Sequence, residues 1–272
     1  MRRRTLAFAV AVPLVTVGLV WLAQRVSPAT PVVDRVTVLD ASERSTTLAQ
    51  ARRSGEIAVL DAFITEQEAR CAGGDPGEFR VLAEAHLERC LLRDRRRGMA
   101  VGRPVHAELP DAHRRDIEAG LRAADRAIEG GDSSADVHRI RSSLMSLRVT
   151  GLVSALAERP AIHEALRAAE AIDPRHPRVV VARACEKLFA PNALLGHDPA
   201  GAKRMFLLAA AALPLDERPL TFAAMCAFLL GESEEAVRLL EDAIARNPHN
   251  VYALEVLRRL RASEPEPFAR DA

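Results

Sequence analysis

Residues 202–214, AKRMFLLAAAALP, and residues 236–248, AVRLLEDAIARNP, carry the same pattern of small and large side chains 34 positions apart. In each stretch Ala is followed four positions later by a large apolar residue, then three positions on by a second Ala, and finally by Pro. The apolar spacing is that of a helix, and the proline marks its end. The repetition therefore predicts a chain of similar helical hairpins.

This pattern resembles the second helix of a tetratricopeptide (TPR) repeat. Residues 220–248 match that family best, with Gly231 in the turn between the two helices. The first helix matches less closely, because small or aliphatic residues replace the usual Trp, Gly and Tyr. Upstream the spacing lengthens, since Pro174 lies 40 residues before Pro214. The resemblance implies an all-α, TPR-like solenoid of antiparallel helical hairpins with divergent repeats.

The composition agrees with an all-α class. The 272 residues are 49% hydrophobic and only 4% aromatic, and most of the apolar residues are Ala, Leu and Val. Such side chains suit close helix contacts, and the length allows about five or six hairpins. The net charge is +1. A nucleic-acid partner is not expected, because a domain that binds nucleic acid usually carries a basic excess.

Glycine, aspartate and proline mark the ends of several helices. Residues 73–76, 130–132 and 196–199 each place Gly before Asp, which suits the end of one helix and the capped start of the next. The predicted helices span 44–53, 56–71, 77–97, 111–129, 135–157, 160–171, 177–190, 200–212, 218–230, 233–246 and 250–262.

An uncharged, apolar run of 19 residues, 5–23, follows three arginines at the start of the sequence. As a helix it would span about 28 Å, close to the hydrocarbon thickness of a bilayer, and the arginines favour a cytoplasmic N-terminus. We therefore expect a single transmembrane helix in a bacterial inner membrane, with the C-terminal domain periplasmic. The alternative is a cleaved signal peptide that ends near Ser27-Pro28-Ala29.

The predicted domain organisation follows from these two patterns. It comprises a membrane anchor or signal segment at 1–24, a linker at 25–42, the helical solenoid at 43–262 and a polar tail at 263–272.

Four cysteines would meet an oxidising compartment in an exported domain. Cys185 and Cys226 fall at nearly equal depth in the first helices of neighbouring repeats, so a disulfide between them is one possibility. They are one position out of step around the helix, and buried thiols are the other possibility. Cys71 and Cys90 would lie roughly 20 Å apart along a hairpin, which excludes a bridge between them.

Familiar catalytic signals are absent from the sequence. It contains no His-Glu-x-x-His, Cys-x-x-Cys, Gly-x-Ser-x-Gly or Gly-x-Gly-x-x-Gly motif. His86 and Cys90 have the spacing of two metal ligands on one helix face, but no third and fourth ligands are evident, and a partly buried histidine above a core cysteine explains the pair better. The sequence predicts a protein that is not an enzyme and that has no catalytic residues, no cofactor and no metal site.

The family resemblance also implies a binding groove, because fixed positions of each first helix line the concave face of a TPR solenoid. In this protein those positions include Arg139, Ser143, Arg178, Arg218, Thr221, Met225, Tyr252 and Arg259. Guanidinium groups pair well with carboxylates, so we hypothesise an acidic peptide, the free carboxyl terminus of a polypeptide or an organic acid as the ligand. The alternative is that these arginines only solvate an open face.

Together these features predict a membrane-anchored, extracytoplasmic TPR-like adaptor that binds a protein partner in the cell envelope. Residues 190–209, with Gly196-His197-Asp198-Pro199, also resemble the T-component TPR proteins of TRAP transporters, although the acylated cysteine of those proteins is missing. One alternative is therefore an accessory binding component of a solute transporter. Another is a chaperone of the cytochrome c maturation type.

Overall fold

The computed structural model describes residues 43–95, 109–150, 152–190 and 196–268, and every regular element in these ranges is an α-helix. The predicted membrane segment at residues 5–23 lies outside the described residues. None of the described helices combines the length and the apolar character needed to cross a bilayer. In chain order the helices are α2 (Glu43–Arg53), α3 (Ile57–Cys71), α4 (Pro76–Arg95), α5 (Asp111–Glu129), α6 (Ala135–Ser146), α7 (Leu152–Ile172), α8 (Pro177–Phe189), α9 (Pro199–Ala212), α10 (Arg218–Leu229), α11 (Ser233–Arg246) and α12 (Val251–Arg261).

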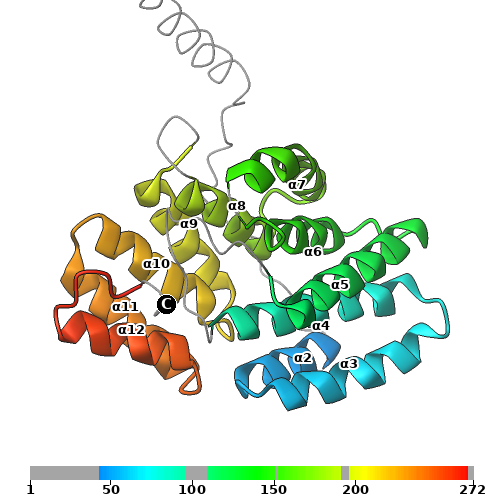
Figure 1. Cartoon of the computed structure of the whole chain (residues 1–272), viewed down its shortest axis with the longest axis horizontal. Coiled ribbons are helices and arrows are strands. Elements are labelled where there is room, and N and C mark those ends of the chain that lie inside the picture. The colour runs from blue at the N-terminus through cyan, green and yellow to red at the C-terminus, as the bar shows by residue number, and fades with distance from the viewer. Residues whose placement is uncertain (1–42, 96–108, 151, 191–195, 269–272) are drawn as a thin grey trace, which may run out of the picture.

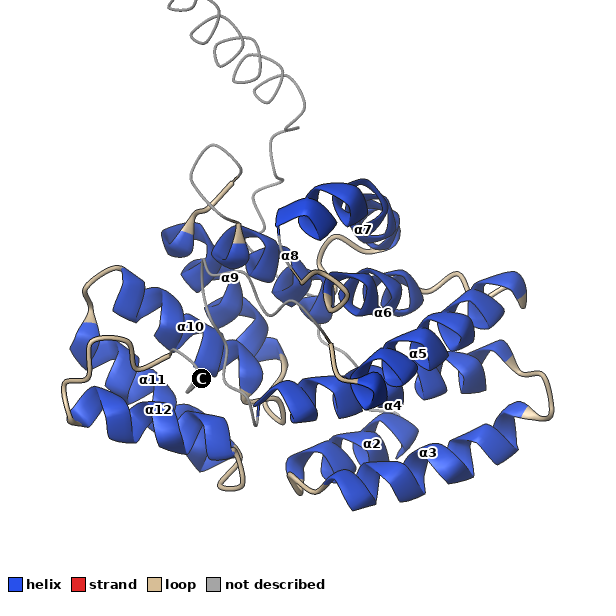
Figure 2. Ribbon diagram, in the orientation of Figure 1, coloured by secondary structure: helices blue, strands red, loops and turns tan. Residues whose placement is uncertain are grey.

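Consecutive helices pack as hairpins, from α2 with α3 to α10 with α11, and α12 follows the last of them. The first helices of neighbouring hairpins also contact one another: α2 packs on α4, α4 on α6, and α6 on α8. The hairpins follow one another around an arc, so that the blue first helices return towards the orange and red last helices (Figures 1 and 2). We call the surface shared by α2, α4, α6, α8, α10 and α12 the inner face.

Two apolar cores hold this arc together. One is formed by residues of α2 to α6, and the other by residues of α8 to α12, while a small cluster around Leu166 connects α6, α7 and α8. In the second core Phe206 is fully buried and stacks on Phe222, with ring centroids 5.2 Å apart. Alanines fill the remaining helix contacts, as the Ala-rich repeat predicts.

The predicted boundary between the helices at 135–157 and 160–171 is wrong. The break follows Ser146, and Pro160 lies inside α7. A proline removes one helical hydrogen bond, but the turns before it carry little packing: Val153 is 83% and Leu156 60% exposed. Breaking the helix at 147–151 instead brings the buried residues after Pro160 back against α6. Hairpin packing therefore overrides the local proline signal.

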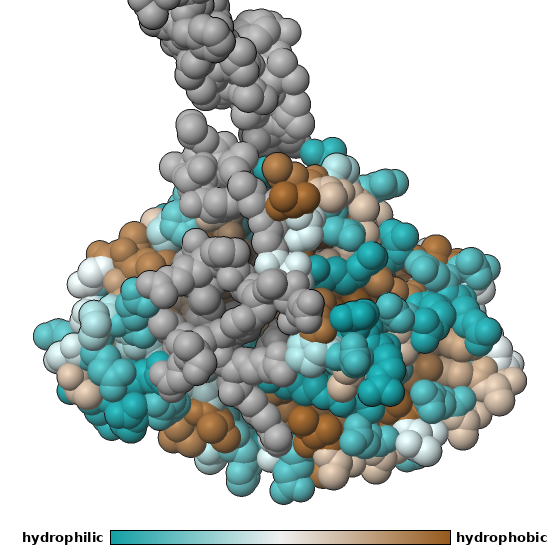
Figure 3. Space-filling model, viewed as in Figure 1, coloured by the Kyte–Doolittle hydropathy of each residue, from teal (hydrophilic) through white to brown (hydrophobic). Residues whose placement is uncertain are grey.

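On the face seen in Figure 3, the described surface is mostly hydrophilic, with scattered apolar patches. Val153 and Leu156, near the start of α7, are exposed. Exposed apolar side chains of this kind are normal when they occur singly.

The start of α9 shows how Asp and Gly mark the beginning of a helix. The Asp198 carboxylate accepts a hydrogen bond of 2.8 Å from the Gly201 backbone N–H, and Lys187 Nζ lies 2.9 Å from the same carboxylate. A Cβ on Gly201 would lie only 2.1 Å from Asp198 Oδ2, so the close cap requires glycine there. Asp198 and Gly201 therefore have a structural role, because they cap the start of α9.

The segment after α12 is apolar where it meets the fold. The sequence predicts a polar tail at 263–272, yet Pro267 and Phe268 are buried. Phe268 joins the core of α8 to α12, so the solenoid packing extends beyond residue 262.

Candidate functional site

The inner face carries a network of charged side chains from five helices or their adjoining turns. Each hairpin presents its first helix to this face, so side chains that are far apart in sequence meet there. The network consists of Arg52, Glu84, Glu88, Asp136, Arg139, Arg178, Asp216, Glu217 and Arg218.

Glu84 of α4 binds the arginines of the next two hairpins. Its carboxylate lies 3.2 Å from Arg139 Nη2 on α6, and it also accepts a hydrogen bond from Arg178 on α8. Arg139 in turn lies 2.9 Å from Asp136, one turn earlier on its own helix. One acidic side chain therefore ties α4, α6 and α8 together.

Glu88, one turn after Glu84, reaches still further. It lies 2.9 Å from Arg218 Nη1 at the start of α10, across 130 residues of sequence. Arg218 Nη2 also lies 2.5 Å from Asp216 Oδ2. Positions four apart share one helix face, so Glu84 and Glu88 both face inward from α4.

A third contact closes the arc between its first and last hairpins. Arg52 Nη1 at the end of α2 lies 2.8 Å from Glu217 Oε2 and 3.4 Å from Asp216 Oδ1, and its Nη2 donates to the Leu215 carbonyl at 3.0 Å. The Arg52 side chain is 4% exposed and that of Glu217 is completely buried. Asn250 Nδ2, just before α12, donates to Glu217 Oε1 at 3.3 Å.

Pairing favours the ionised forms of Arg178, Asp216 and Asp136. The charge of Glu84 is the main reason that the pKa of Arg178 is raised. Burial alone would raise the pKa of Asp216, but Arg218 and Arg52 outweigh it and hold that pKa well below its usual value. Asp136 behaves in the same way, because Arg139, His176 and Arg178 outweigh the effect of its burial on its pKa.

The predicted groove residues lie on α6, α8, α10 and α12, which share the inner face, but the arginines do not project freely into a groove. Arg139, Arg178 and Arg218 are brought together through the carboxylates of α4, and Arg259 pairs with Glu255 at 2.8 Å. Ser143 is half-buried, whereas Thr221, Met225 and Tyr252 are buried. The open, solvated face considered as an alternative does not describe these arginines either.

Sequence reasoning missed Glu84 and Glu88, the acidic partners of the arginines, and it also missed Arg52. All three belong to the first two hairpins, where the repeat pattern is weakest. The only sequence signal was the spacing of Glu84 and Glu88 on one helix face.

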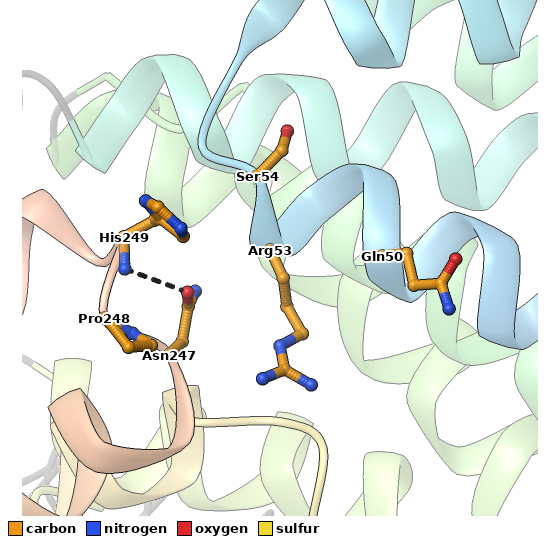
Figure 4. Close-up of a pocket in the computed structure, with 6 residues that line it drawn as sticks. All are labelled: Gln50, Arg53, Ser54, Asn247, Pro248 and His249. Carbon is orange, nitrogen blue, oxygen red and sulfur yellow. Dashed lines mark hydrogen bonds between the residues drawn. The ribbon is translucent and has the colours of Figure 1, made fainter.

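Where α2 meets the loop between α11 and α12, the contact leaves a pocket of about 280 Å³ (Figure 4). Arg53 lies at its edge and donates to the Arg246 carbonyl at 2.5 Å. Gly55, with φ +72°, brings the backbone close to this loop, because a Cβ there would lie 3.2 Å from the His249 carbonyl oxygen. The pocket is lined by Gln50, Arg53, Ser54, Asn247, Pro248 and His249.

The four cysteines form no disulfide in the described structure. Burial raises the pKa of both Cys185 and Cys226 to about 12. A thiol with such a pKa is almost wholly protonated at neutral pH, and the thiolate is the reactive form. Cys226 therefore acts as a small core residue, and the partly buried Cys185 packs against the same core.

His86 and Cys90, the pair with metal-ligand spacing, are both buried between α4 and α5. His86 Nδ1 lies 3.7 Å from Asp116 Oδ1, and Cys90 Sγ contacts the His113 carbonyl at 4.0 Å. Across the described ranges, no three His, Cys, Asp or Glu side chains converge in a way that could hold a metal ion.

Comparison with known proteins bears on the fold. No family model and no curated protein matches the sequence. The thermophilic TPR protein TTC0263 of Thermus thermophilus has a similar structure, with a TM-score of 0.51 and 15% identity over 82% of this chain and 98% of that chain. YrrB, a TPR protein with an unusual peptide-binding site, aligns with a TM-score of 0.36 and 11% identity over 79% of this chain and 97% of that chain.

The likeness to the Thermus protein confirms the predicted fold. The chain is a divergent, TPR-like helical solenoid. At 15% identity this likeness concerns the fold alone.

Proposed function

We propose that this protein is a non-catalytic scaffold that binds a protein or peptide partner at its inner face. We further propose that residues 1–24 hold it in the bacterial inner membrane, with the solenoid on the periplasmic side. The partner would be another envelope protein that offers an acidic segment.

The observation that carries the partner proposal lies at the start of α8. Arg178 Nε and His176 Nδ1 are buried and have no hydrogen-bond partner among the described residues. An unsatisfied buried polar group costs roughly 1–3 kcal/mol, so a group that bonds to these atoms would be favoured there. Arg178 already binds the Glu84 carboxylate through Nη1, and its side chain remains 22% exposed. A second acidic group fits this chemistry.

Site-specific photo-crosslinking in the native membrane tests this proposal. A crosslinking residue at Ser143, which is half-buried on the inner face, is compared with one at Ser233, which is exposed at the start of the outer helix α11. We expect a defined protein adduct from position 143 only, and we expect a glutamate-rich competitor peptide to reduce it. Equal adducts from both positions, or none from position 143, would rule out an inner-face partner.

The membrane proposal has its own test. The apolar run at 5–23 is its support. We expect the full chain to stay with the membrane through a carbonate wash, and we expect protease to reach the solenoid once the outer membrane is opened. Release of a shortened, soluble chain would favour a cleaved signal peptide instead.

A further inference from the structure

The chain reverses direction directly after α12. Ser263 adopts a left-handed backbone with φ 57°, its N–H bonds to the Leu260 carbonyl at 3.0 Å, and the Glu264 N–H bonds to the Arg259 carbonyl at 3.0 Å. This pair of bonds is the Schellman arrangement, in which glycine usually takes the left-handed position. The reversal sends the red end of the chain back from α12 towards α10 (Figure 1).

The returning segment, Glu264–Phe268, lies on α10 and α12 as a peptide would. Its aromatic end is anchored: Phe268 is 6% exposed, and its ring centroid lies 5.6 Å from that of Phe228 on α10. Its acidic end meets two arginines of α12, with Glu264 Oε1 3.3 Å from Arg258 Nη1 and Oε2 3.9 Å from Arg259 Nε. Both ends thus have matching partners.

Between these two ends, two of the three residues are exposed. Pro265 and Glu266 are exposed, whereas Pro267 is buried beside the aromatic anchor. The segment bends at Pro265 and turns at Pro267 and Phe268, so it belongs to no helix or sheet. A short stretch outside the helices, held by an aromatic anchor and surface ion pairs, is the kind of local structure that opens before the rest of the fold.

We infer that the surface of α10 and α12 under this segment is a peptide-binding site, and that residues 264–268 fill it as an internal ligand. The inference rests on the proposed scaffold function and specifies the partner chemistry. The partner offers a non-helical, proline-containing segment with an acidic residue four positions before an aromatic one. It belongs to a separate protein and competes with residues 264–268 for Phe228, Arg258 and Arg259.

A pair of substitutions at Ser263 tests this competition without touching the site. Ser263 is exposed, so neither change disturbs the core. Ser263→Val disfavours the left-handed turn, because β-branched residues rarely adopt it, and should release the segment. Ser263→Gly should hold the segment at least as firmly as the wild type does.

The probe is a fluorescein-labelled peptide with the sequence of residues 263–269, and the readout is fluorescence anisotropy with the full-length protein in detergent. The apparent affinity for the probe is proportional to the fraction of protein molecules in which the site is not occupied by residues 264–268. We therefore expect Ser263→Val and Phe268→Ala to bind the probe at least about tenfold more tightly than the wild type. Ser263→Gly should bind it no better than the wild type. Adding Phe228→Ala to Phe268→Ala, or replacing the probe's Phe by Ala, should abolish binding.

Several results would overturn the inference. One is a folded Ser263→Val protein, with unchanged helix content, that does not bind the probe. Another is equal binding by the wild type and the Ser263→Val protein. A Ser263→Val dimer that exchanges residues 264–268 between copies would replace the separate partner by a second copy of the protein.

This test is independent of the crosslinking test at Ser143. A probe that binds while no adduct forms at position 143 would keep a scaffold that binds its partner at α10 and α12, and would remove the proposed acidic contact at α6 and α8. An adduct at position 143 without probe binding would keep the proposed partner contact at α6 and α8 and would remove the α10–α12 site.

Discussion

Replacing Arg52 by Met should test how strongly the first and last hairpins are joined. Methionine keeps most of the length of the side chain and removes its charge. The change takes the guanidinium away from Glu217, which is completely buried, and from Asp216, and it removes the hydrogen bond to the Leu215 carbonyl. The substitution therefore leaves buried negative charge with less compensation.

Removing one partner of a buried ion pair typically costs about 3–5 kcal/mol. Arg218 still lies 2.5 Å from Asp216 after the change, which spares one of the two carboxylates. We therefore expect Arg52→Met to lower the free energy of unfolding by about 3 kcal/mol, at the lower end of that range.

Urea unfolding of the full-length protein in detergent, followed by far-UV circular dichroism, measures this loss. Adding Glu217→Gln to Arg52→Met removes the uncompensated buried charge and should restore part of the stability, with a coupling of about 2 kcal/mol in the double-mutant cycle. Arg70→Met is the matched control, because Arg70 pairs with Glu66 on the exposed face of α3; it should cost under about 0.5 kcal/mol. An Arg52→Met loss as small as that of the control would refute the argument that this contact closes the arc.

Three further predictions concern α4, α9 and the second core. Burial, together with the charge of Arg89, lowers the pKa of His86 from 6.5 to about 4, so the folded protein binds fewer protons at this residue than the unfolded chain does. The contribution of His86 to the free energy of unfolding should therefore be complete above pH 6.5 and fall by roughly 3 kcal/mol as the pH drops to 4. Urea titrations across this range should show a flatter profile for His86→Gln. Gly201→Ala should cost about 1–2 kcal/mol by thermal unfolding, because its Cβ displaces the Asp198 cap, and should cost little once Asp198→Ala has removed that cap. Phe206→Ala should cost about 3–5 kcal/mol, since the ring is fully buried in the second core; a loss below about 1 kcal/mol in urea would mean that the core is loosely packed.

The helices of this protein could be predicted from its sequence because each depends on the spacing of residues close together in the chain. The spacing of Ala202, Phe206 and Ala209, and its return 34 residues later, needs only one helix face to be recognised. The same locality explains the error at Pro160. A proline is a strong signal within a helix, but the boundary between α6 and α7 depends on which residues the hairpin buries.

The sequence predicted the arginines of the charged network but not their acidic partners. Repeat position placed Arg178 and Arg218 on the inner face, because that follows from the register of each helix. Their partners, Glu84 and Glu88, lie 94 and 130 residues away in the sequence. Such pairings depend on the curvature of the whole solenoid, which sums small rotations between repeats, and no local pattern records that sum.

The contact of Arg52 with Glu217 changes the path by which a mechanical load passes through the molecule. In an open helical-repeat solenoid each repeat touches only its neighbours, so a pull on the two ends stretches every junction in turn, as in a spring. Here a force applied at α2 also reaches the turn before α10 directly, through the contacts of Arg52 with Asp216 and Glu217, across 165 residues of sequence. These contacts share the load with the intervening hairpins, so the solenoid should resist extension more than an open one would.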